Sequence, residues 1–108
     1  MDMIARMEAM LSGGQDNALL RFGLGNAHLK AGNPAEAILH LRVAVQHDSA
    51  YSAAWKLLGR ALAEAGHRDE AAGAFEAGIR IAKSNGDLQA VKEMEVFLSR
   101  LRKGRSER

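Results

Sequence analysis

The feature that most limits the fold of this chain is a repeat with a spacing of 34 residues. Residues 24–45 read LGNAHLKAGNPAEAILHLRVAV, and residues 58–79 read LGRALAEAGHRDEAAGAFEAGI. A fixed period of this length is typical of chains built from one helical unit, in which each copy buries the apolar face that its neighbour exposes. We therefore expect residues 1–108 to form a single domain made of stacked, equivalent units.

Each copy of the repeat has the pattern of two helices joined by a tight turn. The apolar residues are mostly Ala, Leu, Met and Ile, which favours helices over strands. Gly32 stands where a helix commonly ends on a residue with positive φ, and Gly66 is its equivalent in the second copy. After Gly32, Asn33 suits the N-cap, Pro34 the first helical position and Glu36 the third, as in a capping box.

Small residues recur inside the predicted helices. Gly25 and Gly59 fall in the first helix of each unit, and Ala37 and Ala71 fall in the second. A glycine within a helix costs roughly 1 kcal/mol relative to Ala, so its occurrence at two equivalent positions needs a reason. We expect the paired helices to approach each other closely at these glycines.

Together, this spacing and these residues resemble the tetratricopeptide repeat family. The first unit departs from the family pattern, since Arg21 replaces its Trp, His28 its Tyr and Ser49 its closing Pro. The resemblance covers 68 of the 108 residues and implies an all-α fold, a right-handed superhelix of antiparallel helix pairs. The second unit carries the family's large and small signature residues at Trp55, Leu58, Gly59, Ala71, Phe75 and Gly78.

The segments on either side of the repeats are predicted to close the stack, because end units need atypical caps. We expect an N-terminal helix at residues 2–12, repeats at 18–51 and 52–85, and a capping helix at 87–103, with Asp87 as its N-cap. The basic segment 104–108 is expected to be disordered. We count about five helices in this division.

The N-terminal helix carries an apolar stripe with two interpretations. The first is that the stripe packs on the first repeat and seals it. The second is that it forms an adaptable lid, which lies in a binding groove or exchanges between protomers through soft methionine contacts. The stripe consists of Met3, Ile4, Met7, Met10 and Leu11.

We find no arrangement of residues that indicates an enzyme, a cofactor or a metal site. The chain has no cysteine, no nucleophile motif around its serines and no glycine loop for phosphate. His40 and His47 share a helix face seven residues apart, whereas helical metal ligands more often stand four apart. His28 is expected to be a packing residue, because Leu62 is its counterpart in the second unit.

Charge and hydropathy limit where the protein acts. The N-terminal residues do not have the pattern of a signal peptide, and no apolar run reaches the ~20 residues that span a bilayer. A helical chain without cysteine suits the cytoplasm. Residues 100–108 hold five Lys or Arg and one Glu, but no aromatic residue stands among them to stack on bases, so nucleic acid is not the expected partner.

One face of the first helix in each unit is left over after packing. In proteins similar to this one, that face lines a concave groove that receives a peptide or a partner helix. The resemblance therefore implies a groove here, and Lys56 and Arg60, one turn apart, favour an acidic or carboxylate-bearing ligand. The alternative is that the N-terminal helix covers Phe22 and that the cations are only solvated. The predicted groove residues are Phe22, Asn26, Leu29, Lys30, Lys56, Arg60 and Ala63.

The sequence therefore predicts a protein–protein interaction module without catalytic activity. The alternative function is a self-associating assembly module that uses the groove or the N-terminal helix, since two repeats are fewer than the three usually needed for a stable solenoid. The expected partner is a protein or peptide, and the expected state is a monomer or a weak homodimer.

Overall fold

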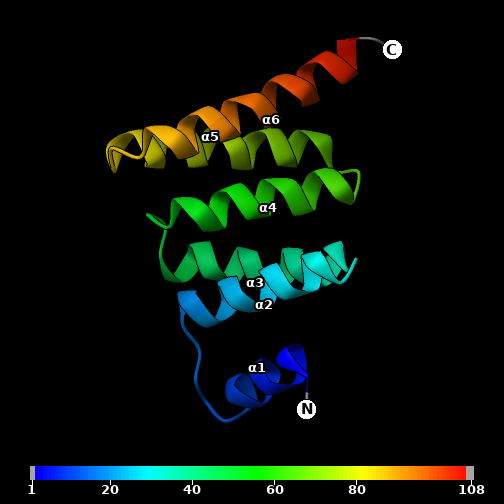
Figure 1. Cartoon of the computed structure of the whole chain (residues 1–108), viewed down its shortest axis with the longest axis vertical. Helices are drawn as coiled ribbons and strands as arrows, with labels where there is room; N and C mark the ends of the chain where they lie inside the picture. The colour runs from blue at the N-terminus through cyan, green and yellow to red at the C-terminus, as the bar shows by residue number, and fades with distance from the viewer. Residues whose placement is uncertain (1, 107–108) are drawn as a thin grey trace.

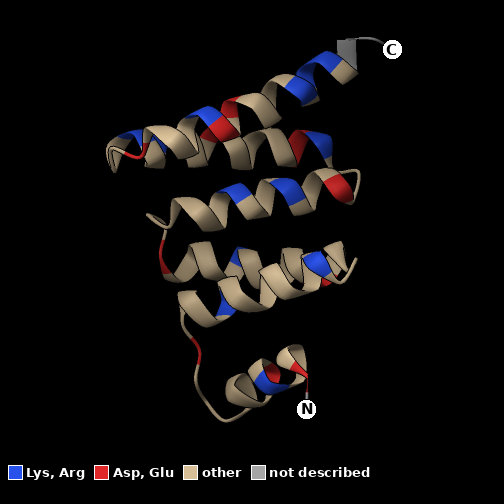
Figure 2. Ribbon diagram, in the orientation of Figure 1, with Lys and Arg blue, Asp and Glu red and all other residues tan. Residues whose placement is uncertain are grey.

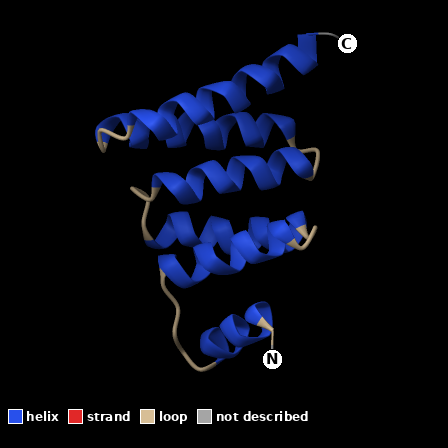
Figure 3. Ribbon diagram, viewed as in Figure 1, coloured by secondary structure: helices blue, strands red, loops and turns tan. Residues whose placement is uncertain are grey.

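The computed structural model describes residues 2–106, and this part of the chain consists of helices without any strand (Figure 3). The prediction of about five helices is too low by one, because two repeat pairs and two flanking helices make six. Their bounds are α1 Met3–Ser12, α2 Ala18–Lys30, α3 Pro34–His47, α4 Ser52–Glu64, α5 Arg68–Ser84 and α6 Leu88–Ser106.

The helices stack along the longest axis of a molecule that measures 45 × 32 × 19 Å (Figure 1). The two predicted repeats are the antiparallel pairs α2–α3 and α4–α5, and α6 packs on α5 beyond them. α1 packs on α2 at the opposite end of the stack. The all-α fold of antiparallel helix pairs predicted from the repeat is confirmed.

The turns between helices use the predicted glycines. Gly32 and Gly66 have φ of 81° and 84°, in the left-handed region that only glycine adopts without strain. In both turns the N–H of the residue after the glycine donates a hydrogen bond to the carbonyl five residues earlier. Asn33 N donates to His28 O at 2.8 Å, and His67 N donates to Leu62 O at 2.9 Å. The same backbone conformation therefore ends the first helix of each repeat.

The predicted capping box at the start of α3 does not form. Asn33 precedes Pro34 as expected, but its side chain makes no cap hydrogen bond. Its amide nitrogen lies instead 3.5 Å from His28 Nδ1, so the side chain is turned toward α2. By contrast, Asp87 does cap α6, because its Oδ1 accepts from Ala90 N at 3.1 Å.

The mid-helix glycines are sites of close helix approach, as predicted. A Cβ placed on Gly59 would lie 2.6 Å from the ring of Phe75, and one placed on Gly25 would overlap Leu41. Each glycine thus admits the large residue that stands 16 positions later, on the second helix of the same repeat. Phe75 and Leu41 are fully buried as a result.

The two ends of the stack differ from the prediction in detail. α6 continues to Ser106, past the predicted bound at 103, and the end of the predicted disordered segment lies outside the described residues. None of the α1 residues is buried, and Met3 and Met10 of the predicted stripe are 68% and 39% exposed. Met7 does pack inward, with its sulfur against Gly23 of α2. No helix of the described chain is long and apolar enough to cross a membrane.

Candidate functional site

The first helices of the repeats, α2 and α4, carry all of the predicted groove residues, and α6 lies beside α4. At the α2 end, the ring of Phe22 stacks on Tyr51 with centroids 5.0 Å apart. Tyr51 precedes α4, so the ring that covers Phe22 comes from the loop between the repeats. Burial, and then the nearby Asp48 carboxylate, raise the pKa of Tyr51. A tyrosine hydroxyl is protonated at neutral pH, so Tyr51 can donate a hydrogen bond to a ligand.

The two cations predicted on α4 both meet α6. Lys56 Nζ forms an ion pair with Glu93 Oε1 at 3.3 Å. The Arg60 guanidinium lies over the ring of Phe97, 5.7 Å from its centroid, in a cation–π contact. Phe97 in turn stacks on the buried Phe75 at 5.4 Å. The two α4 side chains are thus held on the face that α4 shares with α6.

Sequence reasoning missed the contribution of α6, although a signal for it was present. The predicted groove residues Leu29 and Ala63 are 34 residues apart, and the same step from Ala63 reaches Phe97. α6 therefore continues the register of α2 and α4 as the first helix of an incomplete third unit. Tyr51 had no such signal, because it lies in a loop outside the helical pattern.

The remaining predicted groove residues divide between the face and the core. Asn26 is half-buried on α2, between the positions of Phe22 and Lys30. Leu29 is buried and Ala63 is half-buried, and both belong to the core, so they support the face but offer a partner little surface. Lys30 is exposed and lines a cleft against α1 with Asp2 and other residues, and the structure does not bring it to the cations of α4.

Basic residues are present on both α4 and α6. Figure 2 shows Lys or Arg positions along α4 and toward the C-terminal end of α6. On α4 these are Lys56 and Arg60, with Glu64 at the end of the helix. Glu64 at the end of α4 and Glu93 of α6 balance these two charges, so attraction of an anionic group depends on the donors that Lys56 and Arg60 present and not on net charge.

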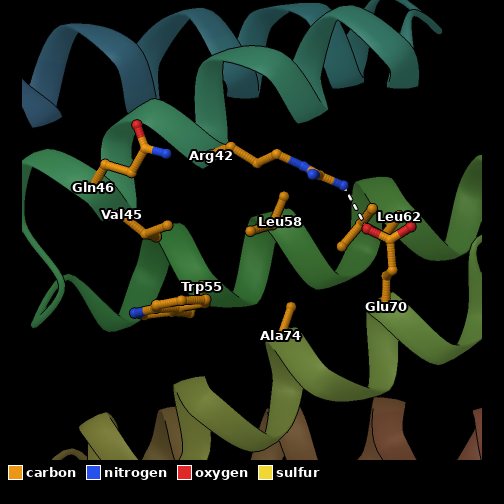
Figure 4. Close-up of a pocket in the computed structure, with 8 residues that line it drawn as sticks. All are labelled: Arg42, Val45, Gln46, Trp55, Leu58, Leu62, Glu70 and Ala74. Atoms are coloured by element: carbon orange, nitrogen blue, oxygen red, sulfur yellow. Dashed lines mark hydrogen bonds and ion pairs between the residues drawn. The ribbon is translucent and has the colours of Figure 1, made fainter.

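A separate cavity of about 370 Å³ lies between α3, α4 and α5 (Figure 4). An ion pair between Arg42 and Glu70 spans it, and the indole of Trp55 forms part of its wall. The indole nitrogen donates to Ser49 O at 2.9 Å, which fixes the ring. Trp55 was predicted only as a packing residue. The other residues that line the cavity are Val45, Gln46, Leu58, Leu62 and Ala74.

A chain of polar side chains joins α2 and α3 near α1. Arg21 binds both oxygens of Asp16, at 2.8 and 2.9 Å, and also approaches His40 Nδ1 at 3.1 Å. The hydrogen bond from Arg21, assisted by His47, holds the pKa of Asp16 at about 2 despite the opposing effect of desolvation. His28 lies behind His40, with the two rings stacked at 5.5 Å. Two of its members, Arg21 and His28, stand where the family pattern has Trp and Tyr.

Comparisons with known proteins agree with this architecture. A family model described as tetratricopeptide repeat matches residues 28–94. The TPR repeat-containing protein PA0015 of Pseudomonas aeruginosa is 50% identical over 104 residues, covering 96% of this chain and 99% of that protein. The solution structure of BPP2914 from Bordetella parapertussis is 45% identical with a TM-score of 0.83, and covers 96% of this chain and 90% of its own. The crystal structure of a tetratricopeptide repeat domain protein from Salinibacter ruber is 22% identical, with a TM-score of 0.74 and coverage of 81% and 97%.

Proposed function

We propose that this chain, which belongs to the tetratricopeptide repeat family, is a non-catalytic module that binds a segment of another protein. Its binding surface is the face formed by α2, α4 and α6. The ligand is an extended segment that carries a carboxylate, from an acidic side chain or a C-terminus, close to an apolar side chain.

The observation that carries this proposal is the arrangement of Lys56 and Arg60. The two side chains stand one turn apart on α4, and their partners on α6 leave donors free. Lys56 has three N–H donors, and Glu93 at 3.3 Å occupies one of them. The guanidinium carbon of Arg60 lies over the Phe97 ring, and a cation–π contact uses none of its N–H donors, so these are available for a carboxylate.

The apolar part of the ligand would contact the aromatic pair at the other end of the face. Phe22 and Tyr51 are both half-buried, so each ring still offers some surface. Asn26 is half-buried on the same helix as Phe22, and its amide can pair with a peptide backbone. Aromatic anchors beside charge-assisted hydrogen bonds are the usual sources of affinity in such interfaces.

The test combines a partner search with a matched pair of charge reversals. Protein carrying Lys56→Glu and Arg60→Glu is compared with protein carrying Arg80→Glu and Lys83→Glu, which changes the same charge on exposed positions of α5. Partners retained from lysate by the wild type are identified by mass spectrometry, and their binding segments are then titrated as peptides. We expect the α4 variant to weaken binding about 10-fold or more, since a charge-assisted bond contributes roughly 1.5–3 kcal/mol.

Two results would contradict the proposed site. One is equal loss of affinity in the α4 and α5 variants, which would reduce the interaction to net charge. The other is a peptide titration by NMR in which the largest shifts fall on the Trp55 indole, because this would move binding to the cavity between α3, α4 and α5.

A second function, self-association, is favoured by apolar side chains at both ends of the stack. Met3 of α1 is 68% exposed, and Leu88 and Val96 of α6 are 66% and 49% exposed. Light scattering over a range of protein concentrations separates the two functions. A dimer that Val96→Ser dissociates would support assembly, whereas a monomer at all concentrations supports the peptide-binding module.

A further inference from the structure

Two histidines and a glutamate from different helices meet beside α1. His28 of α2 and Glu36 and His40 of α3 each offer one possible ligand atom, and these atoms lie within 4.8 Å of one another. Glu36 and His40 stand four residues apart, so their side chains project from one face of α3. From the sequence, His40 and His47 were rejected as a metal-binding pair and His28 was expected to be a packing residue. In the structure it is His28, from the other helix of the repeat, whose ring stacks on His40.

His28 provides an independent sign of a missing ligand. The residue is only 7% exposed, and its Nε2 is buried without a hydrogen-bond partner. A carboxylate oxygen of Glu8, on α1, lies 3.4 Å from this nitrogen without forming a hydrogen bond. Two ligands of one tetrahedral Zn²⁺ are also about 3.4 Å apart when each bond is about 2.0–2.1 Å. A buried ring nitrogen that lacks a partner otherwise destabilises the fold.

We propose that His28, Glu36 and His40 bind one divalent transition metal ion. Glu8 of α1, whose carboxylate lies 3.4 Å from His28 Nε2 but outside the group of three, would have to move toward the ion to become the fourth ligand. Imidazole and carboxylate ligands in this number suit Zn²⁺. No catalytic role is attributed to the ion, which would tie α1 to the first repeat. The site is distinct from the face proposed to bind a partner, so neither proposal depends on the other.

The distances allow the site to close with small movements. Three atoms 4.8 Å apart would stand about 2.8 Å from a central ion, so each must move by roughly 0.7 Å to reach a bond of 2.0–2.1 Å. Glu8 and Glu36 are exposed, so their side chains have room to rotate, whereas His40 is held by its stacking on His28 and its contact with Arg21. The exposure of the two glutamates also gives the ion a path from solvent, and the buried His28 has the least freedom to move.

Asn33 can orient His28 for this role. A histidine that binds a metal through one nitrogen usually donates a hydrogen bond from the other. The Asn33 side chain lies 3.5 Å from His28 Nδ1, and rotation of its amide would present the oxygen as the acceptor. This contact accounts for the side chain of Asn33 being turned away from the cap of α3.

Arg21 lowers the expected affinity of the cluster for a metal ion, so its replacement tests the proposal directly. Its Nη1 lies 3.1 Å from His40 Nδ1, so the guanidinium competes for a ring nitrogen and repels a cation. Asp16 holds the guanidinium through two hydrogen bonds and offsets part of its charge. If the cluster binds metal, Arg21→Gln should tighten binding, which a purely structural cluster does not predict.

The experiment measures Zn²⁺ affinity of the full chain by competition with a chromophoric chelator. We expect one bound ion, a loss of affinity of about 10-fold or more in His40→Gln and Glu36→Gln, and a gain of several-fold in Arg21→Gln. His47→Gln is the control, because His47 is on the same helix and pairs with Asp16 but lies outside the cluster. Thermal melts with Zn²⁺ and with EDTA should show stabilisation that depends on the ion in the wild type and in His47→Gln alike.

Several outcomes would overturn the site. These are the absence of any Zn²⁺ binding, equal affinity in the wild type and His40→Gln, and an equal loss in His47→Gln, which would indicate adventitious binding by surface histidines. His28→Gln is a further variant, but it alters a buried residue. Ring proton signals of His28 that do not shift when Zn²⁺ is added to the wild type would therefore count against the proposal without any mutation.

Discussion

Replacement of Gly59 by alanine tests whether the glycine positions are set by helix packing. The added Cβ would lie 2.6 Å from the Phe75 ring, 0.8 Å short of the lower limit of ordinary contact, 3.4 Å. Phe75 is fully buried and stacks on Phe97, so its ring has little room to retreat. Such overpacking costs about 1–3 kcal/mol, and the better helix propensity of Ala returns roughly 1 kcal/mol. The balance is a net loss of up to about 2 kcal/mol.

The matched control is Gly73→Ala on α5. Gly73 is also within a helix, but it is exposed, and a Cβ there would meet nothing within 4 Å. This variant should gain about 0.5–1 kcal/mol from helix propensity alone. The two alanine variants should therefore differ by about 2 kcal/mol in urea denaturation followed by circular dichroism, and by roughly 8 °C or more in melting temperature.

The reasoning fails if Gly59→Ala is as stable as Gly73→Ala. That result would mean that α4 and α5 separate easily and that the close approach at Gly59 is not required by the fold. Gly25→Ala provides an internal check, because its Cβ would overlap Leu41 in the equivalent position of the first repeat. It should lose stability in the same direction.

Three further predictions follow from other contacts. Phe97→Ala should destabilise the chain by about 2 kcal/mol, since the half-buried ring packs on Phe75. It should also weaken partner binding, because Arg60 loses the ring that holds it. An unchanged denaturation midpoint would contradict the first of these expectations. Deletion of residues 1–13 should lower the melting temperature without loss of the helical stack, since α1 has no buried residue; full unfolding would contradict it. The pKa of Asp16, lowered from 3.8 to about 2, means that its stabilising contribution is present above pH 3.8 and is lost as the pH falls through about 2. The melting-temperature difference between wild type and Asp16→Asn should shrink over that interval and would refute the argument if it stayed constant.

The parts of the fold that the sequence predicted are those decided by local chemistry. Gly32 and Gly66 end helices because only glycine adopts positive φ freely, and Asp87 caps α6 because its side chain reaches an amide three residues away. The close helix approach at the mid-helix glycines was also predicted correctly. A loss of helix propensity that recurs at equivalent positions in both repeats implies a common packing cause. Each of these signals needs only a few neighbouring residues or the repeat itself.

The features of the fold that could not be predicted from the sequence depend on contacts between distant residues. Asn33 has every local feature of an N-cap, yet its side chain turns to His28 on the preceding helix. Gly104 was expected to start a disordered segment, but it lies in α6, where a Cβ would meet the guanidinium of Arg68 at 3.1 Å. For the groove, Lys56 and Arg60 were identified, but their partners Glu93 and Phe97 are on a helix that had been assigned only a capping role.

The position of α6 in the register of α2 and α4 makes the length of this stack adjustable in whole units. Insertion of one more segment of 34 residues between α5 and α6 would present to each neighbour the surface that it already packs against. The new unit would carry the same glycine turn between its two helices as the existing repeats. A longer binding face could thus arise by tandem duplication within the coding sequence, while α1 and α6 keep their places at the two ends.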